Sequence, residues 1–60
     1  MYNLITYSDN IRYYLEYVHD DGTVVLTRDY ADAYTDLEEH VQYIRRTYHL
    51  GAFILHPAGE

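Results

Sequence analysis

Cysteine is absent from this 60-residue chain, so neither a disulfide nor a thiolate metal site can stabilise its fold. This absence fits a reducing compartment, and we expect a cytoplasmic protein. Long apolar runs are also missing: the stretch Ala52–Leu55 is far too short to span a bilayer, and no charged start followed by an apolar segment marks a signal peptide. We therefore expect no membrane partner.

Residues that carry catalysis or hold metals are equally scarce. Ser8 is the only serine, and the histidines show no pair at the i, i+4 spacing of a helical metal site: His19, His40, His49 and His56. Asp20-Asp21-Gly22 resembles the opening of a calcium loop, but an apolar stretch follows where further oxygen ligands are needed. A glycine-rich phosphate loop is also missing. The sequence thus predicts a protein that is not an enzyme and that binds no metal or cofactor.

Basic residues are few, and acidic residues and tyrosine are abundant. Ten acidic residues face four basic ones, which gives a formal net charge of −6. Because nucleic-acid affinity depends largely on neutralising phosphates with Lys and Arg, direct binding of DNA or RNA is disfavoured, and a basic protein surface is the natural counterpart. Nine tyrosines supply rings that either fill the core of a small domain or anchor an interface.

A β-hairpin is predicted in the first half of the chain. Apolar and aromatic residues alternate over residues 11–18 in the period-two pattern of a half-buried strand. His19–Gly22 then has the composition of a tight turn, in which Asp-Gly supplies the positive φ that hairpin turns need. A second strand, rich in β-branched residues, is expected from Thr23 to about Asp29, antiparallel to the first.

An amphipathic helix is predicted after Ala31, where apolar residues recur at spacings of three and four: Tyr34, Leu37, Val41, Ile44 and Tyr48. Asp32 is one candidate cap, and Thr35 with Glu38 matches a capping box, so the first turn should begin between Asp32 and Thr35. Acidic residues precede Arg45 and Arg46 along the segment, as the helix dipole prefers, and Gly51 is placed to end the helix.

These elements predict one α+β domain over residues 1–60, with a small antiparallel or mixed sheet and one helix packed on it. A last strand is expected over Ala52–His56, stopped by Pro57. Residues 1–10 leave an extra N-terminal strand open, with a turn at Ser8–Asn10 leading into the next strand. The expected core consists of Leu15, Leu26, Leu37, Val41, Ile44 and Phe53.

An acidic stripe is the strongest candidate site. Four residues follow the i, i+4, i+7 and i+11 spacing of one helix face, and Asp29 with Asp20 and Asp21 would extend the stripe: Asp32, Asp36, Glu39 and Tyr43. Most of these acids lack a basic residue at i+4 that would neutralise them. One interpretation is a solvated face that keeps a small domain soluble. The other is a docking patch for a basic, nucleic-acid-binding groove, with charge steering the encounter.

The arrangement resembles the small phage-encoded inhibitors of bacterial RNA polymerase. The likeness covers roughly residues 13–57, and its closest stretches are Tyr30-Ala31-Asp32, leading into the helix, and the ending from Gly51-Ala52-Phe53 to His56-Pro57. The resemblance implies a stoichiometric protein that lodges an acidic surface in the DNA channel of the polymerase and blocks transcription initiation. The family also uses basic residues on its last strand, where this chain has only His56.

Two alternatives stay open. The order of elements is also similar to that of small phage inhibitors of uracil-DNA glycosylase, which are acidic DNA mimics, and an inhibitor of restriction or CRISPR enzymes belongs to the same class. A self-associating structural or regulatory module is the other alternative, because the core of so short a chain is limited and exposed rings such as Tyr14 would suit a homodimer.

Overall fold

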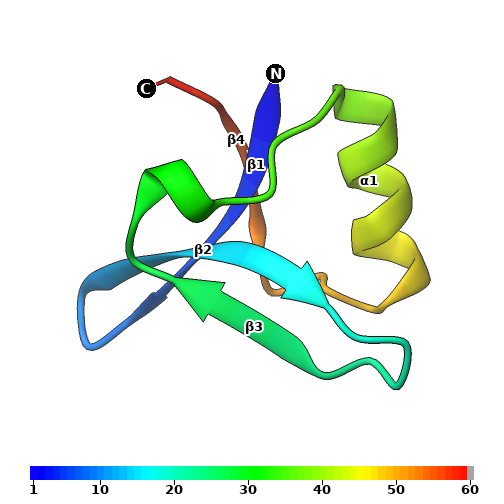
Figure 1. Ribbon diagram of the computed structural model, residues 1–60, viewed down its shortest axis with the longest axis horizontal. Helices are drawn as coiled ribbons and strands as arrows, with labels where there is room; N and C mark the ends of the chain where they lie inside the picture. Colours follow the sequence, from blue (N-terminus) through cyan, green and yellow to red (C-terminus); the bar gives the residue numbers. More distant parts are fainter. Residues whose placement is uncertain (60) are drawn as a thin grey trace.

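The computed structural model describes residues 1–59 and contains a four-stranded antiparallel sheet with one helix packed on it (Figure 1). Along the chain the elements are β1 (Tyr2–Ser8), β2 (Ile11–Val18), β3 (Val24–Thr27), the short 3₁₀ helix η1 (Tyr30–Asp32), α1 (Glu38–Thr47) and β4 (Ile54–Pro57). The strand order in the sheet is β3-β2-β1-β4. The predicted α+β fold class is confirmed, and the extra N-terminal strand exists.

Both predicted turns form hairpins. Asp9 and Asn10 connect β1 to β2 with φ values of 52° and 66°, the left-handed region that Asp and Asn tolerate better than other non-glycine residues. Gly22 has a φ of 90° in the second turn, where its N–H donates to the carbonyl of His19 at 2.9 Å. The two turns bring β1, β2 and β3 together as consecutive antiparallel strands.

β1 occupies an interior position of the sheet, between β2 and β4. Its residues Asn3, Leu4 and Ile5 are all buried, so both of its faces are covered at this point. A strand buried on both faces loses the clean apolar–polar alternation, which is why the pattern of residues 1–10 left its assignment open.

β2 carries a bulge between Leu15 and Tyr17, and the sheet splits beside it. The bulge changes the alternation, so that Val18 packs against the core while Tyr17 is 54% exposed. The segment between η1 and α1 enters the split: the Tyr34 N–H donates to the Leu15 carbonyl at 2.8 Å, and Asp36 exchanges two backbone hydrogen bonds with Tyr2.

The start of α1 differs from the prediction. The helix begins at Glu38 with Leu37 as its N-cap, and Leu37 makes no side-chain capping bond. The predicted capping box is wrong: the hydroxyl of Thr35 donates to the carbonyl of Ala33 at 3.2 Å. The physical reason is tertiary, because the pairing of Asp36 with Tyr2 holds the backbone extended until the residue before the cap.

The end of α1 is closed by His49 and not by Gly51. His49 has a φ of 57°, its N–H donates to the Arg46 carbonyl at 3.3 Å, and the Leu50 N–H donates to the Arg45 carbonyl at 2.8 Å. This is the Schellman arrangement, in which the residue after the left-handed position buries its side chain. Leu50 is accordingly buried.

The core lies between α1 and the sheet and consists of Leu4, Leu15, Val41 and Leu50. Leu15 and Val41 were predicted correctly, and Ile44 and Phe53 are half-buried against this cluster. Two core predictions are wrong. Leu37 is 50% exposed because it precedes the helix, and Leu26 is 41% exposed on the edge strand β3.

β4 begins later than predicted and ends on Pro57 itself, which pairs with Tyr2. Proline is tolerated there because β4 is an edge strand, whose outer side needs no donor.

Candidate partner-binding surface

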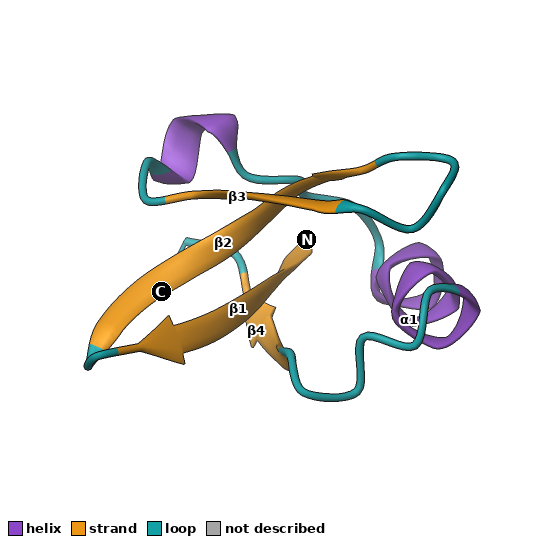
Figure 2. Ribbon diagram, turned by 90° about the horizontal axis from the view of Figure 1, so that it is seen from below, coloured by secondary structure: helices purple, strands orange, loops and turns teal. Residues whose placement is uncertain are grey.

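The predicted stripe does not form one helix face. Asp32 lies in η1 and Asp36 lies in the bridge to Tyr2, so only Glu39 and Tyr43 belong to α1. Both views of the ribbon place η1 and α1 on opposite sides of the molecule (Figures 1 and 2). The correction follows from the late start of α1, because helical spacing has no meaning across the extended segment that precedes it.

The acidic residues of the predicted stripe and its extension, together with Glu38, instead occupy three separate places. Asp29 and Asp32 lie at η1, Asp36 with Glu38 and Glu39 lies at the start of α1, and Asp20 and Asp21 lie in the turn between β2 and β3. Apart from Asp36, which is partly buried, these residues are exposed. This grouping differs from the single helix face that the spacing predicted.

Asp36 is engaged in a local network. Its Oδ1 accepts a hydrogen bond from the Leu37 N–H at 2.7 Å and lies 3.1 Å from Nδ1 of His40, while its Oδ2 accepts from the Tyr34 hydroxyl at 3.2 Å. The bond from Leu37 and then the contact with His40 lower the pKa of this carboxyl. Burial and then the bond to Asp36 raise the pKa of Tyr34. Asp36 therefore positions the start of α1.

Two further aspartates of the candidate set bind backbone with one carboxylate oxygen. Oδ1 of Asp29 accepts from the Ala31 N–H at 3.0 Å and caps η1. Oδ1 of Asp21 accepts from the Thr23 N–H at 2.9 Å, which lowers the pKa of Asp21. Both side chains stay exposed, so each can keep its backbone hydrogen bond and still contact a partner.

The arginines do not neutralise these carboxylates. Arg45 donates to the carbonyls of Phe53 at 3.1 Å and Gly51 at 3.2 Å, and Arg12 donates to the Tyr7 hydroxyl at 3.2 and 3.0 Å. Within residues 1–59 the one contact of 4.0 Å or less between an acidic and a basic side chain is that of Asp36 with His40, which is an ion pair only when the imidazole is protonated. The acidic groups consequently present an uncompensated negative surface.

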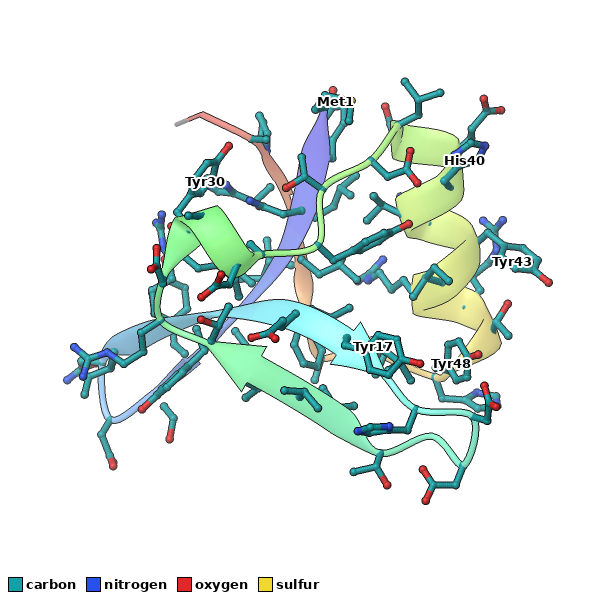
Figure 3. The ribbon with its side chains drawn as sticks, in the orientation of Figure 1. Met1, Tyr17, Tyr30, His40, Tyr43 and Tyr48 are labelled. Carbon is teal, nitrogen blue, oxygen red and sulfur yellow. The ribbon has the colours of Figure 1, made fainter. Side chains whose placement is uncertain are left out.

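Exposed apolar side chains lie beside the acids of α1. A shallow hollow at the first turn is lined by Leu37, Glu38, Glu39 and Gln42. Tyr43 is 62% exposed and points away from the sheet on the outer side of the helix (Figure 3). Apolar and aromatic groups bordered by a polar rim are typical of protein interfaces.

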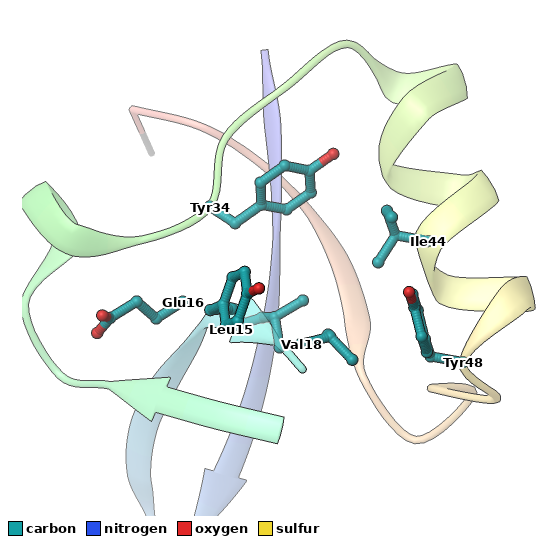
Figure 4. Close-up of a pocket in the computed structure, with 7 residues that line it drawn as sticks. Leu15, Glu16, Val18, Tyr34, Ile44 and Tyr48 are labelled. Carbon is teal, nitrogen blue, oxygen red and sulfur yellow. The ribbon is translucent and has the colours of Figure 1, made fainter. Parts of the chain in front are cut away.

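A second feature escaped the prediction: an apolar cleft of about 190 Å³ between β2 and α1 (Figure 4). Its lining residues come from β2, from the segment before α1 and from α1 with its C-cap: Leu15, Glu16, Tyr17, Val18, Tyr34, Ile44 and Tyr48. Tyr34, Ile44 and Tyr48 did share a predicted helix face, but the bulge that turns Val18 toward this cleft left no signal in the pattern.

Residues 1–59 hold no group of three or more His, Asp or Glu side chains that could bind a metal ion. None of the helices in the described part of the chain is long and apolar enough to cross a membrane.

Comparison of the chain with protein-family models, with curated proteins and with solved structures found no match.

Proposed function

We propose that this chain is a non-enzymatic protein-binding inhibitor or adaptor that docks its acidic surface onto a basic groove of a nucleic-acid-handling enzyme such as bacterial RNA polymerase. The observation that carries the proposal is the uncompensated charge: Asp29, Asp32 and Glu39 are exposed and have no ion-pair partner among residues 1–59. A net charge of −6 on so small a domain produces a field that attracts basic surfaces and repels nucleic acid.

The apolar groups at the start of α1 supply the short-range part of such an interface. Charge raises the rate of encounter, but residence on a partner depends on desolvated aromatic and aliphatic anchors. Leu37 and Tyr43 are 50% and 62% exposed, and both lie next to glutamates of α1. In this function the acids steer the encounter with the partner, and Leu37 and Tyr43 anchor the complex.

A competition experiment tests this function. Purified bacterial RNA polymerase is immobilised, binding of the chain is measured by biolayer interferometry, and a promoter DNA fragment is added as competitor. We expect saturable binding that weakens with rising salt and that DNA displaces, because both ligands would occupy one basic channel. Binding that DNA leaves unchanged would contradict docking in a nucleic-acid groove.

The same assay separates the candidate partners. Uracil-DNA glycosylase is immobilised in parallel, and sedimentation of the chain alone at several concentrations measures self-association. Binding to the glycosylase with none to the polymerase would replace the polymerase by a repair enzyme as the target. A concentration-dependent dimer with no binding to either enzyme would favour the self-associating module and overturn the inhibitor.

A further inference from the structure

We propose that the cleft between β2 and α1 receives an arginine side chain of the basic protein partner. This inference rests on the function proposed above and specifies which group of the partner is recognised. An arginine combines a three-carbon apolar stem with a planar cation, so the site must offer both an apolar wall and a surface that attracts cations.

The apolar wall is present in the cleft. Leu15 and Val18 on β2 face Ile44 on α1 across a space of about 190 Å³ (Figure 4). These three residues lie in the core or pack directly against it, so the wall is held in place by the fold and does not have to form on binding. A pre-formed wall reduces the ordering cost of an interface.

The surface that attracts cations consists of three phenol rings, those of Tyr17, Tyr34 and Tyr48. The face of an aromatic ring carries negative potential and binds guanidinium or ammonium groups within about 6 Å of its centroid. The chain itself uses this chemistry once: Cζ of Arg12 lies 5.7 Å from the centroid of the Tyr7 ring. Within residues 1–59 no such cation lies over the three rings of the cleft.

Carboxylates border the cleft without entering it. Glu16 lies in the bulge and lines the cleft, and its carboxylate is turned away from the rings (Figure 4). Asp36 accepts the hydrogen bond of the Tyr34 hydroxyl at 3.2 Å. The negative charge of both acids thus favours a cation in the cleft. Neither carboxylate has to be buried without a partner in the apolar interior of the cleft.

Arginine fits this environment better than lysine does. Guanidinium is more weakly hydrated than ammonium and stacks flat on aromatic rings, so it loses less on entering an apolar cleft. The charge of the whole chain disfavours an acidic or phosphorylated group in the same place.

The experiment is an NMR titration with capped tripeptides, which does not depend on the identity of the partner. Acetylated and amidated Gly-Arg-Gly is compared with the same peptide carrying lysine or norleucine, and the aromatic signals of Tyr17, Tyr34 and Tyr48 and the methyl signals of Ile44 are followed. We expect saturable shifts with the arginine peptide, at least about fivefold tighter than with norleucine.

Variants localise the binding. Tyr17→Leu keeps an apolar side chain at an exposed position and should weaken the arginine peptide about threefold or more, whereas Tyr48→Phe keeps the ring and should bind as the parent does. Tyr7→Leu is the matched control, because Tyr7 is 51% exposed, lies outside the cleft and already pairs with Arg12. Glu16→Gln should weaken binding less than Tyr17→Leu does.

Four outcomes would overturn the inference. They are no response to the arginine peptide, equal binding of the norleucine peptide, equal or tighter binding of the lysine peptide, and a dimer whose formation alone shifts the signals of Tyr17 and Ile44. Loss of polymerase binding with a retained arginine response would contradict the proposed function and leave the cleft assignment standing. Polymerase binding without an arginine response would contradict the cleft assignment and leave the proposed function standing.

Discussion

Asn3 and His56 stand directly opposite each other where β1 pairs with β4, and both carry buried polar atoms that have no hydrogen-bond partner within residues 1–59. The atoms are both polar atoms of the Asn3 amide and Nδ1 of His56. Asn3 is 0% exposed. A buried amide without partners destabilises a fold relative to an apolar group of the same shape.

Replacing Asn3 with Val should therefore stabilise the protein. Valine is apolar and of comparable size, favours strands and leaves no orphaned donor or acceptor, so the expected gain is about 1–2 kcal/mol in the free energy of unfolding. Urea denaturation of the parent and the variant measures the difference. A loss of stability of similar size would mean that the amide has a bonding partner in solution.

Leu37 is half-exposed, although its place in the helical pattern predicts a buried core residue. Leu4→Ala removes a fully buried side chain and should lower the free energy of unfolding by about 2–5 kcal/mol. Leu37→Ala removes a half-exposed side chain and should lower it by less than about 1 kcal/mol. Urea midpoints of the two variants test the assignment of the helix start, and equal losses would place Leu37 in the core.

Asp36 should contribute to stability in a pH-dependent way. Its pKa is lower in the folded protein than the value of about 3.9 of an unfolded chain, so the charged carboxylate favours the folded state. That contribution is complete above the unfolded pKa and is lost as the pH falls through the lower folded pKa.

An NMR titration of the Asp36 carboxyl measures this pKa directly. His40→Ala should raise it only in part, because the bond from the Leu37 N–H is the larger cause. A folded pKa at or above the ordinary value would show that the network around the carboxyl is absent in solution.

The acidic groups should act on the rate of encounter. The triple variant Asp20→Asn, Asp32→Asn, Glu39→Gln removes one charge from each of the three places and leaves the capping carboxylates of Asp29 and Asp36 intact. We expect slower association with the partner, a shallower dependence on salt and unchanged folding. Binding kinetics at two salt concentrations measure both effects.

A single pair of variants separates local from overall charge. Asp32→Asn and Asp9→Asn change the net charge equally, but Asp9 lies in the turn between β1 and β2, outside the proposed surface. Asp32→Asn should slow association more than Asp9→Asn does. An unchanged association rate in the triple variant would show that the acids serve only solubility.

Tyr43 should act on the rate of dissociation. Tyr43→Ala removes a ring that is 62% exposed and touches little of the fold, so stability should change little. If the ring is an interface anchor, dissociation should accelerate, with a loss of about 2 kcal/mol or more in binding free energy. Tyr43→Phe keeps the ring and should retain most of the affinity, and equal kinetics for Tyr43→Ala and the parent would remove Tyr43 from the interface.

Local patterns predicted the parts of the fold that depend on neighbouring residues. β2 was located residue for residue and the turn at His19–Gly22 was correct, since alternation and turn chemistry are properties of a short window. The helix start was missed because the bridge between Asp36 and Tyr2 joins residues far apart in sequence. The prediction of one acidic helix face was wrong for the same reason.

The candidate site was predictable only as a set of residues. The charge and exposure of Asp32 and Glu39 follow from their chemistry, but the place of each depends on where α1 begins. The cleft could not be predicted, because the bulge in β2 changes which side chains face α1. The sequence pattern around Glu16 gives no sign of this bulge.

The position of β1 between β2 and β4 has a consequence for the order of folding. Tyr2 pairs with Pro57 on one side and with Asp36 on the other, so a ribosome delivers both neighbours of this residue long after the residue itself. Such distant pairings close slowly, since chain entropy must be lost before any contact forms. During synthesis the edge of β1 that faces β4 therefore stays unpaired until β4 emerges, and an unpaired strand edge is a site at which chains aggregate.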